Sequence, residues 1–128
     1  MNTSTSLNQE QKDKVIDYLN KYDTEKDFFA LLGRSLGGAA SGEPPEERGK
    51  NAFRRRLVEI KSAVCSDVRI NSFCEDTNTQ DITQLAIIII ETLLGVNFTG
   101  LDPIILGCLI TRIGLRNICK NELKEIGK

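Results

Sequence analysis

Apolar side chains recur at helical spacing in the N-terminal part of the chain. Two stripes, each with members about one helical turn apart, are visible there: Val15, Tyr18, Leu19 and Tyr22, then Phe28, Leu31, Leu32 and Leu36. Such spacing places the members of a stripe on one face of a helix. It predicts helices over residues 7–22 and 25–36. The first begins with a capping box at residues 6–9, and the second has Asp23 or Thr24 as its N-cap.

A third helix is predicted over residues 47–65. Four apolar side chains fall within a narrow arc of that helix when they are placed at about 100° per residue. These residues are Phe53, Leu57, Ile60 and Val64. Between this helix and the first two, residues 37–49 are rich in Gly and contain a Pro pair, which breaks helices. The chain therefore divides into an N-terminal helical hairpin (1–36), a linker and a C-terminal bundle (50–128), although a long loop within one domain fits equally well.

Two very apolar helices complete the predicted fold. Residues 82–95 follow a capping-box pattern and are apolar on nearly every face, and the pair Asp102-Pro103 is typical of a helix start at 103–119. The Ile run at 87–90 also suits a strand, but the segment is long for one and no second strand is available. We therefore predict an all-α fold, a compact bundle of about five helices. Its centre is an apolar antiparallel hairpin of 82–95 and 103–119, joined by residues 96–101.

Composition excludes several kinds of chemistry. The 128 residues contain no His, which removes imidazole-based catalysis and His-ligated metal sites. The G-x-S-x-G pattern at residues 33–37 therefore lacks a base, and it lies at a helix end rather than in a strand–turn–helix elbow. No C-x-x-C spacing occurs among Cys65, Cys74, Cys108 and Cys119, so buried thiols explain them better than zinc ligands. We expect neither an enzyme nor a metal or cofactor.

The formal charge of −1 hides two basic rows, each on one predicted helix. The first consists of Lys50, Arg54 and Lys61, and the second of Arg112, Arg116, Lys120 and Lys124. Either row is a candidate surface for a polyanion or a partner, while solvated helix faces and compensation of the helix dipole are the simpler explanations.

Glu91 is a candidate buried polar group because it lies within the most apolar helix. Three environments are open for this carboxylate. It faces solvent on the one exposed strip of the helix, pairs with a basic residue such as Arg112, or forms a polar group in a groove.

The functional expectation follows from the excess of apolar helix. A helix that is apolar all round needs covering on every face, which favours a protein-interaction module or accessory subunit that self-associates or docks on a larger partner. The alternative is a helical nucleic-acid-binding or regulatory protein that uses the basic rows. The polar N-terminal segment lacks the features of a secretory signal. The longest apolar stretch of the chain is too short to span a membrane as a helix. A cytoplasmic location is therefore expected.

Overall fold

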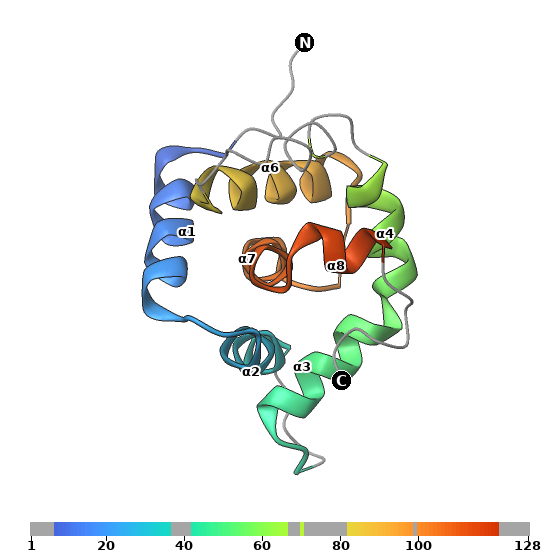
Figure 1. Cartoon of the computed structure of the whole chain (residues 1–128). Coiled ribbons are helices and arrows are strands. Elements are labelled where there is room, and N and C mark those ends of the chain that lie inside the picture. Colours follow the sequence, from blue (N-terminus) through green and yellow to red (C-terminus); the bar gives the residue numbers. More distant parts are fainter. Residues whose placement is uncertain (1–6, 37–41, 67–69, 71–81, 99, 121–128) are drawn as a thin grey trace.

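The computed structural model describes residues 7–36, 42–66, 70, 82–98 and 100–120, and for residues 115, 116 and 120 only the backbone. Helices and no strands are found in these ranges, so the all-α prediction is confirmed for them (Figure 1). The helices are α1 (Gln9–Lys21), α2 (Glu25–Ser35), α3 (Pro45–Arg55), α4 (Leu57–Cys65), α6 (Ile82–Gly95), α7 (Pro103–Ile113) and α8 (Leu115–Lys120).

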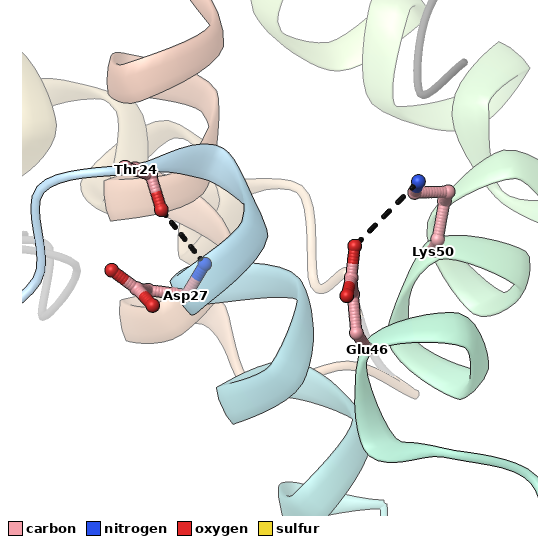
Figure 2. Close-up of polar contacts among 4 residues, drawn as sticks. All are labelled: Thr24, Asp27, Glu46 and Lys50. Atoms are coloured by element: carbon pink, nitrogen blue, oxygen red, sulfur yellow. Dashed lines mark hydrogen bonds and ion pairs between the residues drawn. The ribbon is translucent and has the colours of Figure 1, made fainter.

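Side chains cap the free backbone amides at the N-termini of three helices. The Asn8 carboxamide accepts from Gln11 N at 2.8 Å, while the Gln11 side chain accepts from Asn8 N at 2.9 Å. This capping box lies two residues later than the predicted one, whose Ser6 is outside the described residues. Thr24 Oγ1 accepts from Asp27 N at 3.1 Å (Figure 2), and the Asp102 carboxylate caps α7, both as predicted. The predicted capping box at 81–84 begins on Asp81, which is also outside the described residues.

Two helices that were predicted to be continuous are each divided. The helix expected at 47–65 breaks at Arg56, where the guanidinium donates to Glu59 and lies 4.5 Å from the centre of the Phe98 ring. The helix expected at 103–119 breaks at Gly114, whose φ of 99° is readily adopted only by glycine. The count of about five helices is therefore too low for the part of the chain that the structure describes.

Helix α7 occupies the centre of the molecule. In Figure 1 it is seen along its axis, with α6, α1, α2 and α4 around it and α8 beside it. Its fully or nearly buried residues are Ile105, Leu106, Gly107, Cys108, Leu109, Ile110 and Ile113. Because α6 lies across the same view, the two helices cross, and the expected antiparallel hairpin is not confirmed.

Backbone-to-backbone contact joins α2 to α3. A Cβ at Gly33 would overlap the carbonyl oxygen of Pro45, and one at Gly49 would overlap that of Phe29 and lie 2.9 Å from Gly33 N. Only residues without a side chain permit this approach. The linker predicted at 37–49 overlaps α3, which begins at Pro45 and contains Gly49. Helices α2 and α3 contribute buried residues to one hydrophobic core.

Candidate functional site

The first basic row is split between two helices. Lys50 and Arg54 lie on α3 and Lys61 on α4, on opposite sides of the break at Arg56. Lys50 serves the packing of α2 on α3, because its Nζ lies 3.8 Å from Glu46 (Figure 2) and 5.7 Å from the centre of the Phe29 ring. The three residues therefore do not form one surface: Arg54 is exposed and Lys61 is half-buried, while Lys50 is engaged within the fold.

An exposed apolar side chain follows the three consecutive arginines. Val58 keeps 66% of its surface exposed, and it follows Arg54 by four residues and Arg55 by three. The break at Arg56 lies between Val58 and the two arginines, so the three residues are grouped by their exposure and by their closeness along the chain. We name Arg54, Arg55 and Val58 the α3–α4 strip.

Sequence reasoning missed Val58 and Arg55 as members of this surface. It followed the apolar arc of the predicted helix, on which Val58 does not lie, and it placed only Arg54 of the three consecutive arginines in the basic row. The structure separates these arginines, because Arg54 and Arg55 are exposed whereas Arg56 is half-buried against Phe98. The signal available in the sequence was Val58 itself, an apolar residue that lies outside the buried arc of the predicted helix.

The second basic row is also interrupted, and its first member has a structural role. Arg116 and Lys120 belong to α8, beyond the break at Gly114, and their side chains are outside the described part, as is Lys124. Arg112 Nη2 donates to the carbonyl oxygens of Leu19 at 2.7 Å and Tyr22 at 3.2 Å. A cation at the C-terminal end of α1 satisfies carbonyls that the helix leaves unpaired and complements its dipole.

We expect Arg112→Met to lower the free energy of unfolding by about 2 kcal/mol, the usual size for hydrogen bonds to a charged donor. Methionine keeps an apolar stem against the neighbouring side chains but cannot donate to the α1 carbonyls. Urea denaturation followed by circular dichroism measures the loss. Arg34→Met, on the exposed C-terminal turn of α2, is the matched control and is expected to change stability little. Equal stability of the two variants would contradict the capping role.

Glu91 is half-buried and binds the chain segment before α1. Its Oε2 accepts from Leu7 N at 3.2 Å. Leu7 precedes α1, whereas Arg112 binds the other end of that helix, and a helix of 13 residues is about 20 Å long. The suggested pairing of Glu91 with Arg112 is therefore wrong, and Glu91 instead ties α6 to the start of α1.

The expectation of four buried thiols is also corrected. Cys65 and Cys119 form a disulfide between α4 and α8, with Cα atoms 5.6 Å apart and a sequence separation of 54 residues. Cys108 is a free buried thiol, and burial raises its pKa to about 12, so it is protonated at neutral pH. Cys74 lies outside the described residues. The cytoplasmic location stays a prediction, against which this bond weighs because disulfides persist mainly in oxidising compartments.

The disulfide adds a covalent attachment to the noncovalent contacts of α8. Ile118 is fully buried, and burial of such a side chain contributes about 1.5–3 kcal/mol. Asn117 Nδ2 donates to Ile113 O at 2.6 Å, which joins α8 to the end of α7.

Residues of the G-x-S-x-G pattern are used in helix packing. Gly33 lies in the close contact with α3, and Ser35 Oγ donates to Leu32 O at 2.7 Å within α2. Within the ranges that the structure describes, no three or more Cys, Asp or Glu residues gather where they could hold a metal ion. No helix in those ranges is long and apolar enough to cross a membrane.

The chain matches no protein-family model, and comparison with curated proteins and with solved structures likewise gives no match.

Proposed function

We propose that this protein is a non-enzymatic helical interaction module or accessory subunit that docks on a larger protein through the α3–α4 strip. The supporting observation is the exposure of Val58 at 66%, three and four residues after two exposed arginines. Burying this apolar side chain on a partner is favourable. The guanidinium groups of the two arginines would orient the partner through charge-assisted hydrogen bonds.

The docking surface proposed here differs from the one expected from the sequence. That expectation relied on the apolar helices at 82–95 and 103–119, but the apolar residues of α7 are covered within the chain itself. A partner therefore does not have to cover them. Val58, on the outer face of α4, still has most of its surface in solvent.

The chemistry of the strip favours an acidic protein surface as partner. Carboxylates placed around a small apolar pocket would pair with Arg54 and Arg55 while the pocket accepts Val58. Complementary charge of this kind steers association and fixes orientation. Nucleic acid is less favoured because Val58 would face phosphates, and the strip itself contains no aromatic side chain on which bases could stack.

The test compares variants with matched chemistry on two surfaces. The strip variant combines Arg55→Glu with Val58→Asp, and the control combines Lys14→Glu with Ile16→Asp on α1, where Ile16 is 41% exposed. A partner isolated with the wild-type chain is purified and titrated with each protein. We expect the strip variant to lose at least tenfold in affinity, about 1.4 kcal/mol, and the control to stay within twofold of wild type.

Other outcomes would give the α3–α4 strip a different partner or contradict its role in docking. A stable dimer seen by light scattering and lost in the strip variant would make the partner a second copy of the chain. Salt-dependent binding of a 20-base-pair duplex, abolished by Arg55→Glu alone, would favour the nucleic-acid alternative. Equal affinities of the strip variant and the wild type would contradict the proposal.

A further inference from the structure

We infer that the Cys65–Cys119 disulfide is a redox lock, which holds α8 over apolar side chains of α4 and α7. Helix α8 lies between these two helices in Figure 1 and contacts both. Both cysteines are half-buried, so part of each side chain is open to a small thiol. The lock is independent of the partner proposed above.

The bond gives a short helix a covalent attachment to α4. The helix has six residues, well below the length at which an isolated helix is stable in water. It follows Gly114, whose positive φ separates it from α7. Among the side chains of α8 that the structure describes, that of Ile118 is large and fully buried. The backbone amide of Ile118 donates to Gly114 O at 3.1 Å.

Opening of the lock requires two electrons, which a dithiol reductant supplies. A thiolate of the reductant attacks the sulfur of Cys119, and the sulfur of Cys65 leaves as a thiolate that takes up a proton. The second thiol of the reductant then displaces Cys119 and closes a disulfide within the reductant. The products are two protein thiols and one oxidised dithiol.

Release of α8 uncovers apolar surface. Ile118 of α8 is fully buried in the locked form and belongs to the hydrophobic core. With the bond cut, α8 turns away about Gly114, and Ile118 and the apolar side chains that it covers meet solvent. The exposure of this apolar surface thus depends on the redox state of the surroundings. Helix α8 covers the surface where disulfides form and leaves it where dithiols reduce them.

Hydrogen exchange on the full-length chain tests the lock. The oxidised protein is compared with the same protein after treatment with tris(2-carboxyethyl)phosphine, without denaturant. We expect the amide of Ile118 to lose at least tenfold in protection on reduction and to end at least tenfold less protected than the amide of Leu106. Leu106 N donates to Asp102 O in α7, and its amide loses only the protection that the lower global stability of the reduced protein takes away. Fluorescence of 1-anilinonaphthalene-8-sulfonate should rise at the same time, because the dye reports exposed apolar surface.

Two further measurements separate the lock from a purely structural bond. Iodoacetamide should label Cys65 and Cys119 after reduction and leave the buried Cys108 unlabelled. The double variant Cys65→Ser, Cys119→Ser should show the exchange pattern of the reduced wild type, whatever the reductant. Unchanged protection of Ile118 after reduction would overturn the inference. Equal protection of Ile118 and Leu106 after reduction would also overturn it, since α8 would then open only together with the whole fold. So would a disulfide that is reduced only in denaturant.

Discussion

Replacement of Gly49 by Ala is expected to lower the free energy of unfolding by about 3 kcal/mol, at the upper end of the usual cost of overpacking. The added methyl group would overlap the carbonyl oxygen of Phe29 and lie close to Gly33 N. Both are backbone atoms of α2, so relief requires the two helices to move apart. This cost outweighs the gain of about 1 kcal/mol in helix propensity that Ala brings to a helix interior. Urea denaturation measures the difference.

The same substitution at Gly107 is the matched control. A Cβ there would overlap the side chain of Ile90, whereas its nearest backbone neighbour, Ala86 O, is 3.4 Å away. A second change, Ile90→Ala, should therefore relieve part of the strain, and the double variant should be more stable than the sum of the single effects predicts. At Gly49 the obstacle is backbone, so Phe29→Leu should give no comparable relief. A stability of Gly49→Ala equal to that of wild type would contradict the close approach of α2 and α3.

Loss of the Cys65–Cys119 bond is expected to lower the free energy of unfolding by about 4 kcal/mol, the value of the chain-entropy model for a loop of this size. The bond joins residues 54 positions apart, and cutting it lets the unfolded chain sample many more conformations. Either dithiothreitol or the double variant Cys65→Ala, Cys119→Ala produces this state. The urea midpoint, measured with and without reductant, reports the change.

The double variant also provides the control for the reductant. Dithiothreitol should leave its urea midpoint unchanged, because the bond that it cuts in the wild type is already missing. A wild-type midpoint that does not move on complete reduction, verified by thiol counting, would contradict the stabilising role of the bond.

Local sequence signals predicted much of the secondary structure. The range of α6 is the one expected from its apolar pattern, and Thr24 and Asp102 act as the expected N-caps. These features depend on side chains within a few residues of one another, so a pattern along the chain contains the needed information. The break at Gly114 was visible only as a small residue in an apolar helix, because glycine permits a positive φ without requiring it.

The candidate site was less predictable because long-range contacts decide the role of each basic residue. Arg112 and Lys50 belong to rows that look alike in sequence, yet one caps α1 and the other contacts the Phe29 ring of α2. The pairing of Cys65 with Cys119 is equally non-local. Charge and spacing along one helix do not show which groups of a neighbouring helix lie against a given side chain. The structure leaves Arg54, Arg55 and Val58 at the surface, while Lys50, Arg56 and Arg112 make contacts within the fold.

The central position of α7 has a consequence for synthesis. Helices α1 and α2 leave the ribosome long before the helix on which their apolar faces pack, and contacts such as Arg112 with Leu19 join residues 93 positions apart. Large loops of this kind close slowly. Until α7 emerges, the nascent helices expose apolar faces that other chains can bind, which makes this stage the most prone to aggregation. The protein is thus expected to complete its core only after α7 has emerged and to expose these apolar faces until then.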